Sequence, residues 1–69
     1  MELVPIQKAA KLLQVHPNTM RRNESPDGKY CYIYGLRLRV YKVSNEPGSQ
    51  RRYDRDEIER LLNRLQRDA

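Results

Sequence analysis

The sequence is short of the residues from which metal sites and many catalytic sites are built. It has one cysteine, Cys31, and one histidine, His16, in 69 residues. A single cysteine cannot form a disulfide within the chain, and one cysteine with one histidine cannot supply the ligands of a zinc site. We therefore interpret Cys31 as a small strand residue and expect no metal and no cofactor.

Long apolar runs are also missing. No stretch approaches the roughly 18 apolar residues of a membrane-spanning helix, and no signal peptide is recognisable. These absences predict a cytoplasmic protein without a membrane partner. A chain of 69 residues forms one domain, 1–69, with a small core and marginal stability. Because a deep enzyme cleft needs more scaffold than this, we expect no catalytic activity.

The charge that is present is unevenly distributed. The net charge of +5 divides into about +1 for residues 1–27, +5 for 28–53 and −1 for 54–69. The positive excess therefore lies in one middle segment, where charged residues alternate with apolar ones. This pattern predicts a localised positive surface suited to a polyanion, with a merely solvated face as the alternative.

The first 24 residues have the pattern of two helices joined by a tight turn. Ile6, Ala9, Ala10 and Leu13 fall on one helical face, and Pro5 suits the first turn. Val15 would fill the angle between the helices, and Pro17 would open the second helix, which ends before the turn at 26–28. We predict a helix-turn-helix over about 5–24.

Residues 29–53 have the alternation of strands. Tyrosines alternate with smaller apolar residues from Tyr30, and after Gly35 apolar residues alternate with arginines. A turn cluster at 44–49 lets 50–53 return as a partner strand, which predicts a hairpin wing over about 29–53, unusually long or with an extra strand. Asp54 and Glu57 resemble a capping box for an amphipathic closing helix over about 55–66.

Two groups of residues are candidates for binding. On the second helix, the side chains opposite or flanking Met20 suit base edges and phosphates, and His16 stands at the cap position, where a weak cap or a phosphate donor is possible. The candidates on this helix are Asn18, Thr19, Arg21 and Arg22. The candidates on the hairpin are Arg37, Arg39, Lys42, Arg51, Arg52 and Tyr53, the last of which suits either packing or a sugar-phosphate contact.

Two segments resemble the MerR-like and excisionase-like DNA-binding domains. They are Val4-Pro5-Ile6 with Ala10-Lys11-Leu12-Leu13-Gln14-Val15-His16-Pro17-Asn18-Thr19-Met20-Arg21-Arg22, and Arg51-Arg52-Tyr53-Asp54 with Asp56, Glu57, Ile58 and Leu61. The resemblance implies a small α+β winged helix-turn-helix, with the second helix in the major groove and the wing on the flanking backbone or minor groove. It also implies that Tyr53 pins the wing to the core.

The sequence departs from this family at three places. Asn23 stands where an aromatic residue is common, His16 replaces a small cap, and 29–50 is longer than a minimal wing. No coiled coil follows the closing helix, so the resemblance is to the small stand-alone members, several of which bind direct repeats side by side.

We therefore expect sequence-specific binding of double-stranded DNA by a nucleoid-associated transcription regulator or excisionase-like recombination factor. The expected partners are DNA, further copies of the chain as a dimer or head-to-tail array, and a recombinase. Two alternatives stay open. The chain could be the DNA-binding head of a serine recombinase or transposase without its catalytic domain, or a protein-binding adaptor module that uses the basic wing on an acidic partner.

Overall fold

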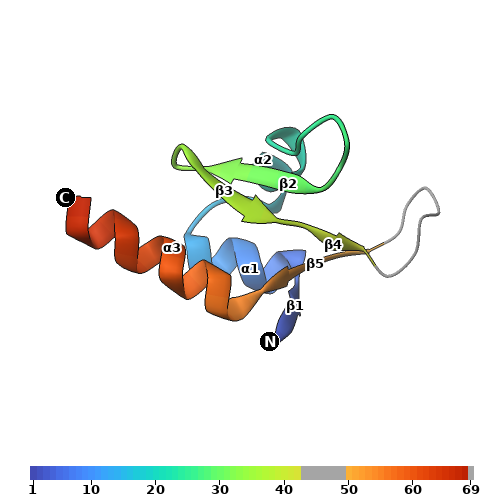
Figure 1. Ribbon diagram of the computed structural model, residues 1–69. Coiled ribbons are helices and arrows are strands. Elements are labelled where there is room, and N and C mark those ends of the chain that lie inside the picture. The colour runs from blue at the N-terminus through green and yellow to red at the C-terminus, as the bar shows by residue number, and fades with distance from the viewer. Residues whose placement is uncertain (43–49, 69) are drawn as a thin grey trace.

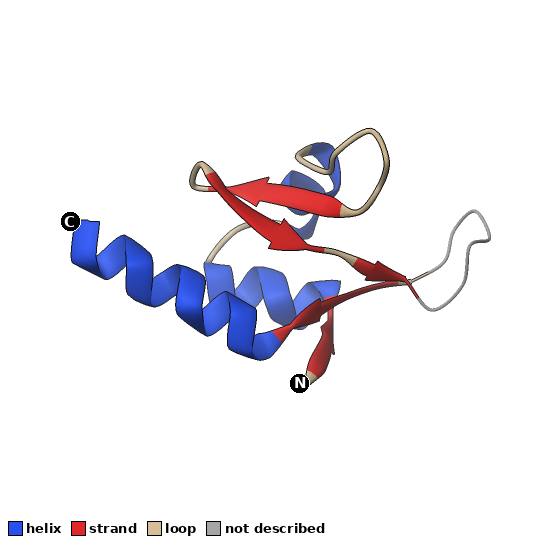
Figure 2. Cartoon of the chain, viewed as in Figure 1, coloured by secondary structure: helices blue, strands red, loops and turns tan. Residues whose placement is uncertain are grey.

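The computed structural model describes residues 1–42 and 50–68, which form an α+β fold with three helices and two antiparallel sheets. The helices are α1 (Ile6–Leu13), α2 (Pro17–Arg22) and α3 (Arg55–Asp68). The strands are β1 (Leu3–Pro5), β2 (Tyr30–Ile33), β3 (Leu36–Arg39), β4 (Tyr41–Lys42) and β5 (Arg51–Asp54). One sheet has the order β1-β5-β4, and β2 pairs with β3 in the other (Figures 1 and 2). The predicted α+β class is confirmed.

Helix α1 buries the face that its spacing predicts. Ile6, Ala9, Ala10 and Leu13 are all buried. Pro5 does not lie in the first helical turn; it ends β1 in an extended conformation and caps the helix from outside. Gln14 then adopts a left-handed conformation (φ 59°), so that the N–H of Val15 donates to the Ala10 carbonyl at 3.0 Å and ends the helix.

The short helix α2 is held by packing. A six-residue helix has too few internal hydrogen bonds to be stable alone. Its stability comes from packing of Met20, which is fully buried. Val15 packs against the same core, as predicted.

Of the two predicted arrangements of the wing, an unusually long hairpin or an extra strand, the structure has the second. β2 and β3 pair with each other around Tyr34 and Gly35, which both have positive φ (53° and 75°), the geometry of a two-residue hairpin turn. β4 belongs to the other sheet and pairs with β5, so the predicted extra strand is confirmed. β5 also pairs with β1, a strand that the sequence did not predict. The predicted turn at 44–49 lies outside the described residues.

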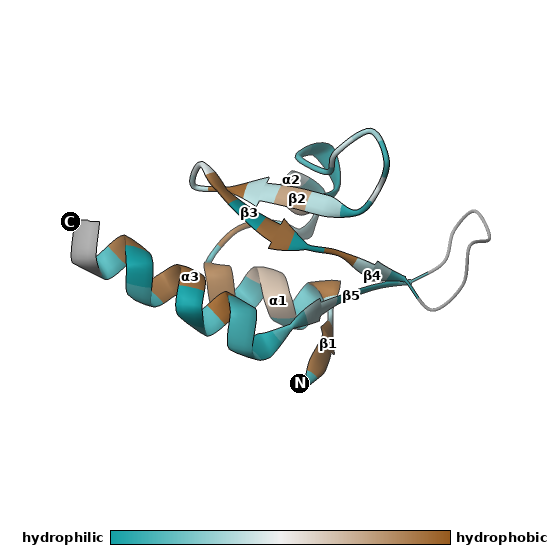
Figure 3. Cartoon of the chain, viewed as in Figure 1, coloured by the Kyte–Doolittle hydropathy of each residue, from teal (hydrophilic) through white to brown (hydrophobic). Residues whose placement is uncertain are grey.

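Helix α3 begins where predicted and continues two residues further. The carboxylate of Asp54 accepts a hydrogen bond from the N–H of Asp56 at 3.1 Å, which confirms it as the cap. The predicted capping box is wrong, because Glu57 accepts the N–H of Arg39 at 2.7 Å and thereby ties α3 to β3. Apolar and polar bands alternate along α3 as on an amphipathic helix (Figure 3), and Ile58 is fully buried.

The core joins both sheets to α1 and α3. The hydroxyl group of Tyr34 donates a hydrogen bond to the Leu13 carbonyl at 2.7 Å, which connects the β2–β3 turn to the end of α1. The buried apolar residues are Val4, Ile6, Ala9, Ala10, Leu13, Met20, Cys31, Ile33, Leu38, Val40, Tyr53, Ile58 and Leu61. This arrangement holds β5 against α1, which positions the candidate site.

Candidate nucleic-acid interface

Helix α2 presents a polar face away from Met20. Asn18, Arg21 and Arg22 are exposed and Thr19 is half-buried. Asn18 is not independent of its neighbour, because its side-chain oxygen accepts a hydrogen bond from Arg21 at 2.9 Å. The pair presents an amide and a guanidinium group together, which can contact a base edge and a phosphate from one position.

His16 caps α2 with its imidazole ring. Its Nδ1 accepts the N–H of Asn18 at 3.1 Å, and Pro17 follows at the first helical position. The predicted cap is thus confirmed, although the side chain lacks the oxygen that caps usually supply. With Nδ1 accepting, the neutral ring carries its proton on Nε2, the nitrogen that remains as a donor.

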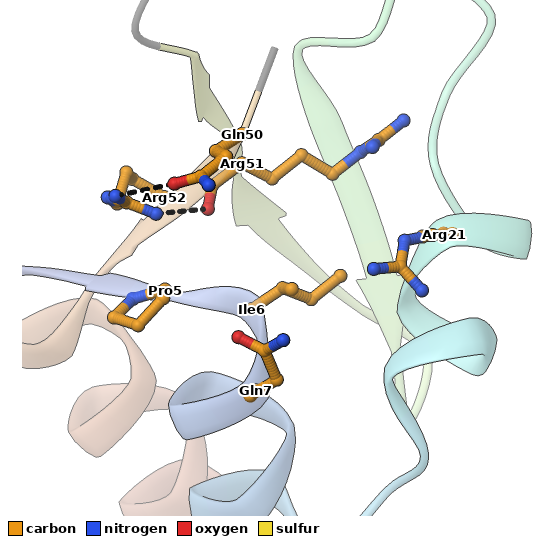
Figure 4. A pocket seen from close by; sticks show the side chains of 7 residues that line it. All are labelled: Pro5, Ile6, Gln7, Arg21, Gln50, Arg51 and Arg52. Atoms are coloured by element: carbon orange, nitrogen blue, oxygen red, sulfur yellow. Dashed lines mark hydrogen bonds between the residues drawn. The ribbon is translucent and has the colours of Figure 1, made fainter. Parts of the chain in front are cut away.

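A cavity of about 340 Å³ separates α2 from β5. Its lining residues are Pro5, Ile6, Gln7, Arg21, Gln50, Arg51 and Arg52 (Figure 4). Figure 4 shows the Arg21 guanidinium group directed toward Ile6 and Gln7, with Arg52 on the opposite side. The cavity therefore brings a predicted residue of α2 together with two predicted residues of β5.

The two wing arginines at this cavity differ in their partners. Arg52 donates to the Gln50 side-chain oxygen at 2.9 Å, which leaves its charge without a carboxylate among the described residues. Arg51 instead makes two hydrogen bonds to Glu24, at 2.5 Å and 3.2 Å, and these raise the pKa of its guanidinium group. Lys42 lies 3.7 Å from the same carboxylate. Arg51 and Lys42 are therefore partly neutralised within the fold.

Glu24 was not among the site residues predicted from the sequence. It lies just after α2, and its carboxylate is only 13% exposed. By binding Arg51 of β5 it fixes the wing strand against the segment that follows α2. Its negative charge is unremarkable in the sequence, and no local spacing links it to a residue so far along the chain, so no sequence feature could have identified it.

Arg37 and Arg39 lie on the solvent face of the β2–β3 hairpin, apart from the cavity. Each guanidinium group lies over the Tyr30 ring, at 4.5 Å and 5.5 Å from its centre, and Arg39 also lies 5.6 Å from the centre of the Tyr41 ring. Such cation–π contacts hold the arginine side chains extended over the sheet. Tyr30 was not among the predicted site residues.

Arg37 also borders a second depression, of about 390 Å³, on the α3 side of the hairpin. Arg60 and Arg64 of α3 line it with Arg37, beside a single carboxylate, Glu57. The structure thus divides the predicted basic wing into a group at the cavity and a group on the hairpin.

The structure removes Tyr53 from the predicted contact residues. Its side chain is fully buried, so it cannot reach a sugar or phosphate. Burial is also the main cause that raises the pKa of its hydroxyl group, which has no hydrogen-bond partner among the described residues. Tyr53 therefore holds β5 to the core.

Cys31 is buried as well, and its Sγ donates to the Met20 carbonyl at 3.3 Å. Burial is the main cause that raises the pKa of its thiol from 9.0 to about 11. Since the folded state favours the protonated thiol, its stabilising effect is present below pH 9 and is lost as the pH rises through about 11.

The titration of the Cys31 thiol should lower the free energy of unfolding by about 2 kcal/mol between about pH 8 and pH 10.5. Urea unfolding at both pH values measures the effect, and Cys31→Ala should show a correspondingly smaller fall. Equal pH dependence of the two proteins would contradict the assignment.

Neither a metal cluster nor a membrane span is found in the described part of the chain. No group of three or more His, Cys, Asp or Glu side chains there could hold a metal ion. No helix among the same residues is long and apolar enough to cross a bilayer. Comparison of the chain with protein-family models, with curated proteins and with solved structures found no match.

Proposed function

We propose that the protein is a sequence-specific double-stranded DNA-binding protein with a winged helix-turn-helix arrangement. In this arrangement α2 enters the major groove, and the wing, formed by β4 and β5 with the β2–β3 hairpin beside it, contacts the backbone. The observation that carries this proposal is that Arg21 of α2 and Arg52 of β5 line the same cavity. Guanidinium groups from two separate elements at one opening suit a polyanion that spans both elements.

The exposed face of α2 supports base reading in this proposal. Arg22 and the bonded pair of Asn18 and Arg21 are the polar groups that can reach base edges when the helix lies in the groove. Thr19 and His16 lie at the amino end of the helix, where phosphate contacts are common. The proposed roles are therefore base contacts for Asn18 and Arg22, and backbone contacts for Thr19, Arg21 and the wing.

The proposal includes the relationship to MerR-like and excisionase-like domains that the sequence suggested. It makes the protein a nucleoid-associated transcription regulator or a recombination accessory factor in the cytoplasm. Its proposed partners are DNA, neighbouring copies on repeated sites and, in the second role, a recombinase. No catalytic step is assigned to any of its residues.

Arg22→Ala is expected to weaken binding to the preferred site by about 1–3 kcal/mol and to relax specificity, because it removes a base contact. Arg52→Ala should weaken binding to preferred and random DNA equally, since phosphates are the same in both. The preferred site is first selected from a random duplex pool, and affinities are then measured by fluorescence anisotropy.

Arg51 is a poor probe for this experiment, because its removal also leaves Glu24 without its closest partner. Far-ultraviolet circular dichroism of each variant checks that it is folded. If Arg22→Ala leaves the ratio of specific to random binding unchanged, α2 is not the recognition helix. If no duplex is selected at low salt, the proposed function is wrong.

A further inference from the structure

The outer face of the β2–β3 hairpin carries tyrosines and arginines in register. On β2 this face is formed by Tyr30 and Tyr32, which alternate with buried side chains. On β3 it is formed by Arg37 and Arg39, which are both exposed. The antiparallel pairing places Arg39 opposite Tyr30 and Arg37 opposite Tyr32. Each aromatic ring on this face therefore has a guanidinium group as its cross-strand neighbour.

The two tyrosine rings of this face differ in what covers them. The Tyr30 ring is half-buried, and both guanidinium groups lie over it, at 4.5 Å and 5.5 Å from its centre. Tyr32 takes part in no cation–π contact within the described residues, and it is 48% exposed. Tyr32 is therefore an uncovered aromatic surface next to two positive charges.

The charges of this face are not neutralised by a carboxylate. Neither Arg37 nor Arg39 forms an ion pair in the part of the chain that the structure describes. Glu57 approaches β3, but it accepts the backbone N–H of Arg39 and not its side chain. An arginine that lies over a ring still has N–H groups at the edge of its guanidinium plane, and these suit phosphate oxygens. The face thus combines a ring for stacking with two groups for binding phosphate.

This combination suits unpaired bases better than a duplex. The faces of the bases in a duplex are covered by the neighbouring base pairs, so that a protein reaches only their edges and the backbone. Unpaired bases can separate and stack on aromatic side chains or on guanidinium planes. Proteins that bind single strands combine a positive surface with such aromatic side chains.

We propose that the outer face of the β2–β3 hairpin binds single-stranded DNA, with a base stacked on Tyr32 and the flanking phosphates on Arg37 and Arg39. This binding goes beyond the proposed recognition of a duplex by α2, and it depends on different residues from those that line the cavity with Arg21. The two modes together suit DNA in which a duplex continues into an unpaired strand.

Three substitutions of Tyr32 test the stacking. Tyr32→Ala should weaken binding of a thymine strand of about ten nucleotides by about 5- to 150-fold, the effect of losing one stacked base. Tyr32→Phe keeps the ring and should bind as the unmodified protein does. Tyr32→Leu keeps a large apolar side chain without a ring and should bind as weakly as Tyr32→Ala. Fluorescence anisotropy at low salt measures all three affinities, and circular dichroism checks that each variant is folded.

A spectroscopic signature reports the stacking directly. The chain has no tryptophan, so Tyr32→Trp introduces a single indole on the hairpin face. Its emission should be quenched as the thymine strand saturates the protein, because the base lies against the ring. Leu3→Trp is the matched control: Leu3 is 43% exposed on β1, and an indole there should keep its emission.

The outcomes separate this inference from the proposed function. Unquenched emission of Tyr32→Trp, or equal strand affinity of Tyr32→Ala and the unmodified protein, would overturn the inference and leave duplex recognition intact. Strand binding that depends on Tyr32, in a protein that binds no duplex, would support the inference and defeat the proposed function. A uracil RNA strand of the same length that binds more than about tenfold tighter than the thymine strand would overturn the assignment to DNA.

Discussion

Raising the salt concentration from about 50 to about 200 mM is expected to weaken binding of the protein to duplex DNA by about 150-fold. The expectation comes from the four arginines with proposed backbone contacts that have no carboxylate partner among the described residues: Arg21, Arg37, Arg39 and Arg52. Each phosphate neutralised by one of them releases counterions, so four contacts give a slope of about −3.6 in log affinity against log salt.

The slope also tests whether the two basic groups act on one DNA. If the hairpin arginines contact the same duplex as the cavity, the double variant Arg37→Ala, Arg39→Ala should bring the slope to about −1.8. Fluorescence anisotropy over a series of salt concentrations measures it. The matched control is Lys8→Ala, Lys11→Ala, which removes two exposed charges from α1 and should leave the slope near that of the unmodified protein.

Two outcomes would contradict this expectation. A slope shallower than about −1 would mean that arginines contribute little to binding, against the proposed function. A slope near −1.8 for the unmodified protein, unchanged in the hairpin double variant, would mean that only Arg21 and Arg52 contact phosphates. Arg37 and Arg39 would then stabilise the hairpin through their cation–π contacts with Tyr30.

Local patterns predicted those parts of the fold that depend on near neighbours in the chain. The spacing of Ile6, Ala9, Ala10 and Leu13 predicted a helix, and all four side chains are buried in α1. Asp54 was predicted as a cap and accepts the N–H of Asp56. In both cases the residues that interact lie within one or two helical turns, so that their relation is visible in the sequence itself.

Pairing between distant segments could not be predicted in this way. β1 is three residues long and runs directly into α1, so it has no alternation to identify it, and its pairing with β5 depends on the whole fold. The turn at Tyr34 is similar. A tyrosine at positive φ is uncommon, and it is accommodated here where its hydroxyl bonds the Leu13 carbonyl in another element.

The candidate site shows the same division. Its residue types were predicted, because arginine and asparagine on a helix after a tight turn suit DNA. Their grouping was not, since it depends on Glu24 neutralising Arg51 and on Arg37 lying toward α3. The sequence predicted that these arginines form one surface, whereas in the structure they have different partners and lie on different faces.

Met20→Ala is expected to lower the free energy of unfolding by about 2–5 kcal/mol, because it leaves a cavity where a fully buried side chain was. A domain of 69 residues has about 3–10 kcal/mol of stability in total, so this variant should lose a large share of its stability. Met1→Ala is the matched control: Met1 is 81% exposed, and its replacement should change stability by less than about 0.5 kcal/mol.

The same substitution links the core to the proposed interface. Met20 is the buried residue of α2, a helix too short to persist without it, so α2 should lose its order before α1 and α3 do. Amide hydrogen exchange should therefore show faster exchange in 17–22 than in 6–13, with DNA affinity falling further than the folded fraction alone accounts for. Uniform loss of protection, with affinity that follows the folded fraction, would show that α2 unfolds only together with the rest of the domain.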